Sequence, residues 1–215
     1  MEDQYKETHR TWNNIAQLYE DKFMHLELYN DTYQTFCDLL SSLDASILEI
    51  GCGPGNITQQ LLSSNPNLKI LATDISQNMI DLAKKNNPDI DTLVLDARNL
   101  KTLNRKFDGI ICGFTVPYLS KEDCIEMLSE CAQLLNSHGI IYISFVPGDY
   151  NESGFISGST GKRTFFYYHS LKTIQTTLES NKMSIIKLQD KTYNKSDHQF
   201  EIHTILIAKK LEFNN

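Results

Sequence analysis

Three glycines behind a short apolar run are the residues whose types and spacing best support binding chemistry. The run Ile47–Ile50 leads into Gly51, Gly53 and Gly55, with one residue between successive glycines, and a predicted helix follows. Glycine lets the main chain turn tightly and approach a ligand closely, and a helix start offers unpaired N–H groups to an anionic group. The segment therefore predicts a strand-to-helix turn that binds a small molecule with a negative end.

An acid in the apolar run separates two kinds of ligand. The dinucleotide fingerprint GxGxxG requires a glycine where this chain has Asn56, and Glu49 stands just before the turn, where we expect it to point toward the ligand. A carboxylate repels a pyrophosphate but attracts an ammonium or sulfonium group. The charge of Glu49 thus favours a cationic ligand.

The elements that must position this turn alternate between strands and helices. Strands are predicted at Ile47–Ile50, Lys69–Thr73, Thr92–Leu95, Phe107–Cys112 and Ile140–Val146. Between them, Ser76 and Ser120 are predicted helix caps, Pro88 marks a helix end, and Gly139 suits a left-handed helix stop. The alternation is typical of βαβ units and of a mostly parallel sheet covered on both faces.

Segments outside this alternation complete the predicted fold. Apolar residues recur at helical spacing over Trp12–Phe23 and Tyr33–Leu40, which predicts two extra helices before the first strand. Pro147–Thr164 is rich in glycine and serine and lacks periodicity, which predicts a long loop. Such loops in compact domains are usually functional lids or disordered.

The end of the chain predicts a helix at Leu171–Ser180 and two strands, Met183–Leu188 and Phe200–Ala208. The connection Gln189–Gln199 is too short for a crossover with its own helix, so these two strands should pair antiparallel. The fold class is therefore α/β: a Rossmann-like, doubly wound sheet of seven strands, mostly parallel with one antiparallel strand near the C-terminus.

Composition limits the functions that this fold could carry. The chain has 215 residues, and a single domain is expected, with 1–45 as a helical lid, 46–146 as the binding core, and 147–215 as the substrate loop and C-terminal hairpin. Its 20 Lys and Arg against 27 Asp and Glu give a formal charge of -7, which argues against nucleic acid as a partner.

The five cysteines show no CxxC pair, and no cluster of His and acids has metal-ligand spacing, so we expect reduced thiols and no metal. No secretory signal is visible at the N-terminus, and the longest apolar stretch, Ile140–Val146, is far short of the ~20 residues that cross a bilayer. A cytoplasmic protein that does not insert into membranes is expected.

The pattern Glu49-x-Gly51-x-Gly53-x-Gly55 resembles the first motif of the class I S-adenosylmethionine-dependent methyltransferases, of the small-molecule type. Ile70–Asp74 is similar to the second strand of that family, and Leu93–Ala97 to the third. Matches to the fourth strand, at Phe107–Cys112, and to the helix end and fifth strand, at Leu134–Ile141, follow in the family's order. The resemblance covers roughly Trp12 to Lys209. The helix end departs from the family, with Asn136–Gly139 where many members carry a proline and two glycines.

The resemblance implies S-adenosyl-L-methionine as cofactor and S-adenosyl-L-homocysteine as product. It implies that Asp74 holds the ribose hydroxyls and that Asp96 accepts from the adenine amino group. The residues that it implies for cofactor binding are Tyr19, Glu49, Gly51, Cys52, Gly53, Gly55, Asp74, Ile75, Met79, Asp96, Ala97, Arg98, Cys112, Gly113 and Phe114. For Asp74 and Asp96, the alternative is a helix-capping or turn-capping role.

Candidates for the acceptor side are aromatic. Substrate contacts are expected from Trp12, Phe23, Tyr118, Tyr167 and Tyr168, although such stripes also form ordinary cores. In relatives with an N-terminal extension, a tyrosine approaches the methionine end of the cofactor, and Tyr19 is the candidate for that catalytic role. His169 is the candidate base for an oxygen or nitrogen acceptor, with helix initiation as its alternative role.

The resulting functional hypothesis is methyl transfer to an oxygen or nitrogen atom of a small molecule. One alternative is a regulatory module that binds S-adenosylmethionine without turnover. A nicotinamide-dependent oxidoreductase and an aminopropyl transferase are weaker alternatives. Asn56 disfavours the oxidoreductase, and the absence of a second acidic pair near Gly113 disfavours the aminopropyl transferase.

Overall fold

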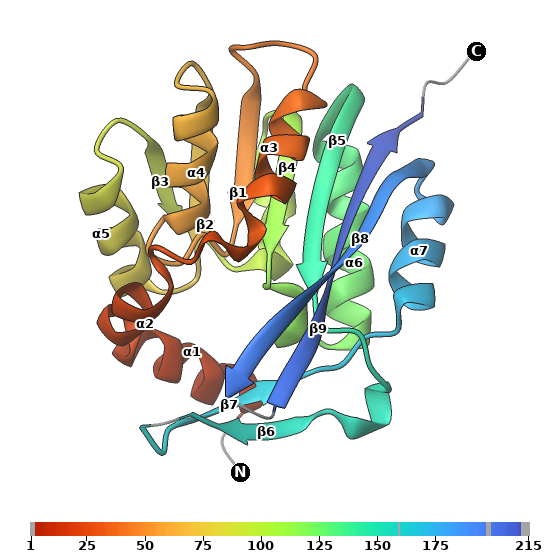
Figure 1. The fold of residues 1–215 in the computed structure, drawn as a ribbon. Coiled ribbons are helices and arrows are strands. Elements are labelled where there is room, and N and C mark those ends of the chain that lie inside the picture. Colours follow the sequence, from red (N-terminus) through yellow and green to blue (C-terminus); the bar gives the residue numbers. More distant parts are fainter. Residues whose placement is uncertain (1–2, 159, 197–198, 212–215) are drawn as a thin grey trace.

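A seven-stranded sheet in the order β3-β2-β1-β4-β5-β9-β8 forms the centre of the computed structural model, which describes residues 3–158, 160–196 and 199–211 (Figure 1). The strands are β1 (Ser46–Ile50), β2 (Lys69–Asp74), β3 (Asp91–Val94), β4 (Phe107–Gly113), β5 (Leu135–Phe145), β8 (Met183–Ser196) and β9 (Gln199–Lys210). The first five pair in parallel, and β9 is antiparallel to both β5 and β8. The predicted mostly parallel sheet with one antiparallel strand is therefore confirmed.

Alternate residues of the buried strands face two separate cores, as expected for a sheet covered on both sides. Leu48 and Ile50 pack in one core with α6 (Lys121–Leu134) and α7 (Leu171–Ser180). Ile47 packs in the other core with α3 (Asn30–Asp38), α4 (Asn56–Ser64) and α5 (Gln77–Asn86). Both faces are thus covered, and the carboxyl edge of the strands is left to other elements. None of the described helices is long and apolar enough to span a bilayer.

The N-terminal region differs in detail from the prediction. The helix expected at Trp12–Phe23 breaks at Ile15 into α1 (Gln4–Asn14) and α2 (Ala16–Phe23), and a short helix, η1 (Glu27–Tyr29), precedes α3. Asp3 caps α1 by accepting a hydrogen bond from the Tyr5 N–H at 3.0 Å. The polar first turns of α1 lacked the apolar spacing from which the helix was predicted, so its true start was missed.

The predicted loop Pro147–Thr164 is wrong in part, because a second, two-stranded sheet lies within it. After η4 (Tyr150–Glu152), β6 (Gly154–Ser157) pairs antiparallel with β7 (Arg163–Phe166), and Ser159 lies outside the described residues. The rings of Phe155 and Phe165 meet edge to face at 5.1 Å across this pair. Cross-strand aromatic contacts of this kind stabilise a pair of strands. The glycine content of this segment had favoured a loop.

The predicted connection Gln189–Gln199 is also wrong, because β8 continues to Ser196 while residues 197–198 lie outside the described part of the chain. This part of β8 is an edge strand with exposed positions, so it did not show an apolar pattern. The outer parts of the predicted single domain, 1–2 and 212–215, likewise lie outside the described residues.

The helix caps are confirmed, but one helix end is not. Ser76 and Ser120 accept hydrogen bonds from the N–H groups of Met79 and Asp123. The left-handed residue after α6 is His138, with φ of 61°, and not Gly139. A Cβ on Gly139 would lie 3.0 Å from the Asn136 carbonyl oxygen, so glycine is needed there for close backbone approach.

Candidate functional site

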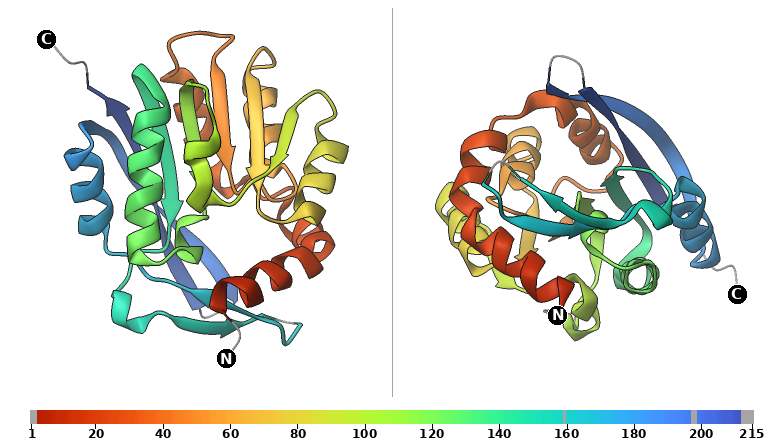
Figure 2. Two further views of the ribbon diagram at one scale, coloured as in Figure 1. Left: turned by 180° about the vertical axis from the view of Figure 1, so that it is seen from behind. Right: turned by 90° about the horizontal axis from the view of Figure 1, so that it is seen from below.

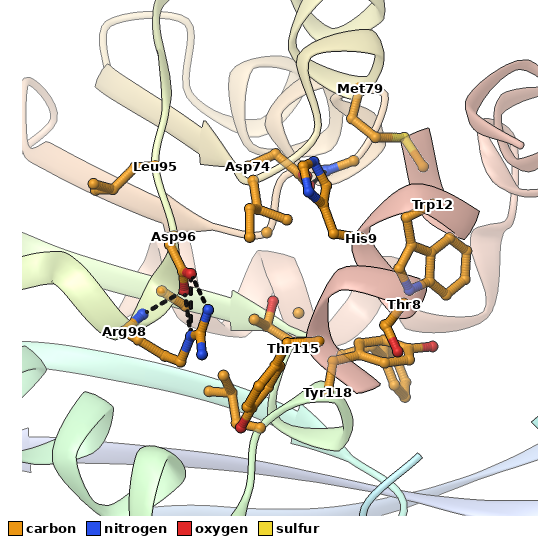
Figure 3. Close-up of a pocket in the computed structure, with 18 of the residues that line it drawn as sticks. Thr8, His9, Trp12, Asp74, Met79, Leu95, Asp96, Arg98, Thr115 and Tyr118 are labelled. Atoms are coloured by element: carbon orange, nitrogen blue, oxygen red, sulfur yellow. Dashed lines mark hydrogen bonds and ion pairs between the residues drawn. The ribbon is translucent and has the colours of Figure 1, made fainter. Parts of the chain in front are cut away.

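A cavity of about 890 Å³, including the space at its mouth, lies at the carboxyl edge of β1 to β4. Helix α1 runs across this edge and forms its roof (Figure 2). Open α/β sheets bind ligands at this edge, near the point where the strand order reverses. Predicted site residues that line the cavity are Trp12, Tyr19, Gly51, Gly53, Asp74, Ile75, Met79, Asp96, Ala97, Arg98, Gly113, Phe114 and Tyr118. Figure 3 shows the acids at one side of the cavity and Trp12 and Tyr118 at the other.

The three glycines of the turn have different reasons to be glycine, although all have positive φ. A Cβ on Gly51 would lie 2.0 Å from the Thr115 hydroxyl oxygen, and one on Gly55 would lie 3.1 Å from the Cα of Ala83. A Cβ on Gly53 would meet only the Tyr19 ring, at 3.6 Å. Close packing therefore requires glycine at positions 51 and 55. At Gly53, by contrast, only the Tyr19 ring covers the backbone.

Asp74, at the end of β2, is fixed by the backbone of the glycine turn. One carboxylate oxygen accepts from the Gly53 N–H at 3.0 Å, and the other accepts from the Ser76 N–H at 2.8 Å. Burial raises the pKa of Asp74, and these N–H groups and His9 oppose that rise. The carboxylate is thus held rigidly at the cavity wall with lone pairs left for a ligand.

Glu49, which precedes the turn, is fully buried and does not line the cavity itself. Its Oε2 accepts from the Thr58 hydroxyl on α4, and its Oε1 has no hydrogen-bond partner. Burial, together with the nearby Asp74, raises the pKa of Glu49 to about 8 against the opposing effect of the Thr58 hydrogen bond. An unpartnered oxygen on a buried acid beside a glycine turn fits a cationic donor.

Asp96, after β3, already has a partner within the chain. Its two oxygens accept from the Arg98 guanidinium, with the closest contact at 2.5 Å, and from the Arg98 backbone N–H at 2.9 Å. Burial opposes ionisation of Asp96, but the hydrogen bonds from Arg98 outweigh it and lower the pKa. A ligand amino group would share this carboxylate with Arg98.

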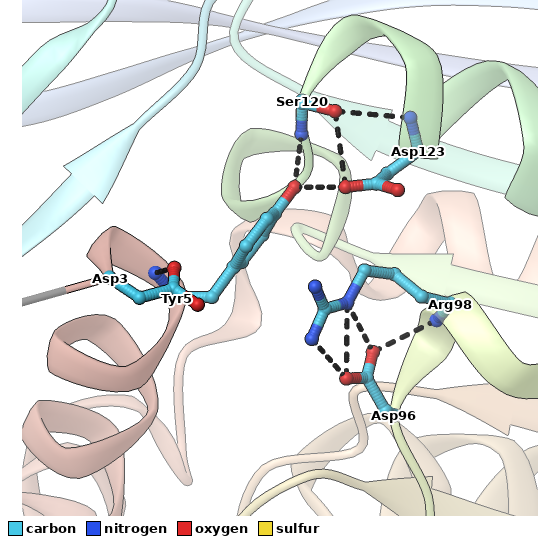
Figure 4. A network of polar contacts seen from close by, with 6 residues as sticks. All are labelled: Asp3, Tyr5, Asp96, Arg98, Ser120 and Asp123. Carbon is cyan, nitrogen blue, oxygen red and sulfur yellow. Dashed lines mark hydrogen bonds and ion pairs between the residues drawn. The ribbon is translucent and has the colours of Figure 1, made fainter.

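Tyr5 joins α1 to this ion pair and to helix α6 (Figure 4). Its ring centre lies 4.0 Å from the Arg98 guanidinium carbon. Its hydroxyl donates to the Asp123 carboxylate and accepts from the Ser120 N–H at 2.8 Å, within the helix cap. At the other end of α1, the Asn13 Oδ1 accepts from the Ser76 hydroxyl at 2.9 Å. Hydrogen bonds therefore hold helix α1, the roof of the cavity, at both of its ends.

Phe114 follows β4 and is held in an uncommon conformation, with φ of 55°. Its N–H donates to both the backbone and the side-chain oxygen of Ser144, each at 3.1 Å. Its ring packs on Tyr29 and His203, at 5.4 and 4.8 Å. Such conformations in bulky residues cluster at functional sites, because the surrounding structure must enforce them.

Several predicted site residues lie outside the cavity. His169 is buried, its Nε2 lies 3.0 Å from the Leu119 carbonyl oxygen, and burial lowers its pKa. It lines a different pocket, with Lys121, Tyr150 and other residues. A helix-start position was the alternative for His169, and its location beside the α7 cap fits that alternative.

The other predicted residues that do not line the cavity are Phe23, Cys52, Gly55, Cys112, Tyr167 and Tyr168. Phe23 packs on the outer side of Tyr19, with ring centres 4.6 Å apart, and Tyr167 packs against Tyr5. Cys112 is a buried residue of β4, with its sulfur 4.0 Å from that of Met127. Phe23 and Tyr167 thus pack against residues that line the cavity, whereas Tyr168 lines the other pocket, with His169.

Sequence reasoning missed six lining residues: Tyr5, Thr8, His9, Leu95, Thr115 and Leu119. The first three lie on α1 at i, i+3 and i+4 and continue to Trp12 at i+7, which is one helical face. This polar stripe was a detectable signal, but only the apolar stripe was used. Among the described residues, no group of three His, Cys, Asp or Glu side chains could hold a metal ion.

Comparison with known proteins finds methyltransferases that are similar in sequence and in fold. Residues 47–139 match a family model described as a methyltransferase domain. The chain is 24% identical to a tRNA N(3)-methylcytidine methyltransferase of Schizosaccharomyces pombe, over 73% of this chain and 67% of that protein. It is 29% identical to a malonyl-[acyl-carrier protein] O-methyltransferase of Priestia megaterium, over 77% and 65% respectively. The chain thus spans about two thirds of the length of these relatives.

A similar solved structure is that of magnesium protoporphyrin IX methyltransferase from Synechocystis with bound S-adenosylmethionine. The TM-score is 0.73 at 18% identity, and the match covers 98% of each chain. The likeness extends over the N-terminal helices and the C-terminal hairpin, so it concerns the whole fold.

Proposed function

Because the chain belongs to the class I S-adenosylmethionine-dependent methyltransferase family, we propose that it transfers the methyl group of S-adenosylmethionine to an oxygen or nitrogen atom of a small molecule. The observation that carries the proposal is the buried Oε1 of Glu49, which lacks a partner beside the glycine turn. The Glu49 carboxylate would attract a cationic, amino-bearing ligand in the neighbouring cavity, whereas it would repel a pyrophosphate.

The residues of the cavity fit the whole cofactor. The open backbone at Gly53 would hold the methionine end, with the buried acid Glu49 behind the glycine turn, and Asp74 would hold the ribose. Asp96 and the apolar residues Ile75, Met79 and Leu95 would hold the adenine. When bound, the cofactor supplies a methyl group activated by a positively charged sulfur.

The chain itself contributes positioning and exclusion of water. Helix α1 covers the strand ends, and the Tyr19 ring lies over Gly53, so the transfer would take place beneath this helix and this ring. Orientation of two reactants can contribute about 7 to 11 kcal/mol to a reaction. His169 lies outside this cavity, so we do not assign it a proton-transfer role, and Tyr19 is retained as a positioning residue.

The cover of α1 over the cavity and the net charge of -7 support a small acceptor. The tRNA methyltransferase among the relatives makes RNA the competing acceptor class. A macromolecular acceptor would require displacement of α1, which is fastened to α5 and α6. We propose further that residues 1–45 act as the lid of the domain and residues 46–146 as its cofactor-binding core.

Isothermal titration calorimetry with S-adenosylmethionine, S-adenosylhomocysteine and NADH tests the cofactor assignment. We expect saturable binding of the two sulfur nucleosides and none of NADH. Binding of NADH alone would refute the proposal. Transfer of labelled methyl from S-adenosylmethionine to small molecules, with total tRNA as a parallel acceptor, tests the acceptor class. Labelling of tRNA alone would refute the small-molecule assignment, and binding without transfer to any acceptor would favour a regulatory module.

A further inference from the structure

The part of the cavity opposite Asp96 is an aromatic box formed by Trp12, Tyr19 and Tyr118 (Figure 3). The Trp12 ring meets Tyr19 edge to face at 5.5 Å and Tyr118 at 5.2 Å. Phe23 and Phe166 pack on the outer sides of the two tyrosines, at 4.6 and 6.0 Å. The box is therefore a rigid apolar compartment, and it adjoins Gly53, where we place the methionine end of the cofactor.

The box contains hydrogen-bond donors that the protein leaves unused. The Trp12 Nε1 is buried and has no hydrogen-bond partner, and Figure 3 shows this nitrogen on the side of the ring that faces the cavity interior. Among the described residues, none accepts a hydrogen bond from the hydroxyl of Tyr19 or Tyr118. A buried donor without a hydrogen-bond partner destabilises the folded protein. The presence of such a donor in a ligand cavity therefore points to an acceptor atom supplied by the ligand.

The charges around the box favour an uncharged ligand. The basic and acidic side chains that line the cavity are His9, Asp74, Asp96 and Arg98, and Arg98 is paired with Asp96. Burial raises the pKa of Tyr19 to about 12 and raises that of Tyr118 as well, so both hydroxyls remain neutral donors. An anionic ligand would find no unpaired cationic side chain in the box and would lie near the buried acids.

We propose that the methyl acceptor is an uncharged molecule with an apolar body that fills the aromatic box and a carbonyl-type oxygen that accepts a hydrogen bond from the Trp12 Nε1. This inference rests on the proposed function, because it takes the rest of the cavity as the cofactor site. It makes Trp12 a specificity-determining residue on the roof helix. The ligand oxygen would replace the missing partner of the indole N–H.

Three probes of one shape test the proposal in the presence of saturating S-adenosylhomocysteine: acetophenone, ethylbenzene, which lacks the oxygen, and benzoate, which carries a charge. Trp12 is the single tryptophan of the chain, so its fluorescence reports directly on the box. Ligand-observed NMR gives affinities for the wild type and for Trp12→Phe, which keeps an aromatic ring but lacks the N–H. Tyr118→Phe is a second variant, and Tyr150→Phe, outside the cavity, is the control.

We expect acetophenone to quench or shift the Trp12 fluorescence saturably and to bind more tightly than benzoate. Trp12→Phe should weaken acetophenone binding about tenfold and ethylbenzene binding less than twofold, because only acetophenone uses the N–H. Tyr150→Phe should leave both affinities unchanged. Equal losses for the two neutral probes, tighter binding of benzoate, or no saturable binding of acetophenone would each overturn the proposal.

The affinity for S-adenosylhomocysteine separates this inference from the proposed function. It should be unchanged in Trp12→Phe, which also shows that the variant is folded. A large loss of S-adenosylhomocysteine affinity in that variant would mean that the N–H serves the cofactor, which overturns the acceptor assignment. Absence of S-adenosylhomocysteine binding in the wild type would instead refute the proposed function itself.

Discussion

The Arg98 guanidinium lies between the carboxylate of Asp96 and the ring of Tyr5, with its central carbon 4.0 Å from the ring centre. A residue at the adenine side of the predicted cofactor site therefore contacts the first turn of the roof helix. We therefore expect the stability of the roof to depend on the occupancy of the site through the Arg98 side chain.

Removal of the Tyr5 hydroxyl should loosen the roof. Tyr5→Phe keeps the ring on Arg98 but loses the hydrogen bonds to Asp123 and the Ser120 N–H. We expect a loss of about 1 to 2 kcal/mol in the free energy of unfolding, as for a part-buried hydrogen bond to a charged group. Amide hydrogen exchange should increase along α1 more than along α4. Equal exchange in both helices would show that the contact does not hold the roof.

Cofactor binding should release a proton from Glu49. Below a pKa of about 8 this carboxyl is largely protonated, and a cationic ligand requires the ionised form. We expect affinity for S-adenosylmethionine to rise as pH increases from about 6 to 8 and to level off above that range.

Calorimetry at pH 7 in buffers of different ionisation enthalpy measures the proton release. Glu49→Gln should bind more weakly and release fewer protons. The same proton release in this variant would assign the proton to another group, with Asp74 the next candidate.

The same acid should make the unliganded protein less stable at high pH. Because the folded pKa of Glu49 is about 8 and its usual value is 4.5, the folded state binds more protons between these values. Its contribution to stability is fully present below about pH 4.5 and is lost as pH rises through 8. The slope is at most about 1.4 kcal/mol per pH unit.

Urea denaturation of the wild type and of Glu49→Gln between pH 5 and pH 9 checks the direction of this pH dependence of stability. The variant should be the more stable protein at pH 9, and this difference should shrink toward pH 5. A difference that grows toward acidic pH would contradict the assignment.

Substitution by alanine should affect protein stability much more at Gly51 than at Gly53. Gly51→Ala places a methyl group 2.0 Å from the Thr115 hydroxyl oxygen, so we expect a loss of several kcal/mol of stability or failure to fold. Gly53→Ala meets only the Tyr19 ring at 3.6 Å and costs about 1 to 2 kcal/mol through its positive φ.

Because Gly53 is the open backbone of the cavity, Gly53→Ala should lower cofactor affinity at least tenfold while the protein stays folded, and Gly53→Val should lower it further. Thermal unfolding and calorimetry of the folded variants measure the two effects. Unchanged affinity in folded Gly53→Ala would remove the glycine turn from the binding site.

The sheet and the floor of the site could be predicted because they depend on short segments with strong physical constraints. A buried strand, a glycine turn and a terminal acid lie within a few residues of each other, as in Glu49 to Gly55 and at Asp74. The roof could not be predicted in the same way. Tyr5 is brought to Arg98 only by the tertiary path of α1, and His169 was assigned from its ring chemistry although its neighbours bury it elsewhere.

Helix α1 is fastened at Tyr5 to α6 and at Asn13 to α5, and Thr8 accepts a hydrogen bond from the Phe165 N–H of β7. Entry of a ligand through the roof is then possible only while these attachments are broken together. Association by that route should be gated: its observed rate should reach a plateau at high ligand concentration, set by the opening frequency of one eleven-residue helix.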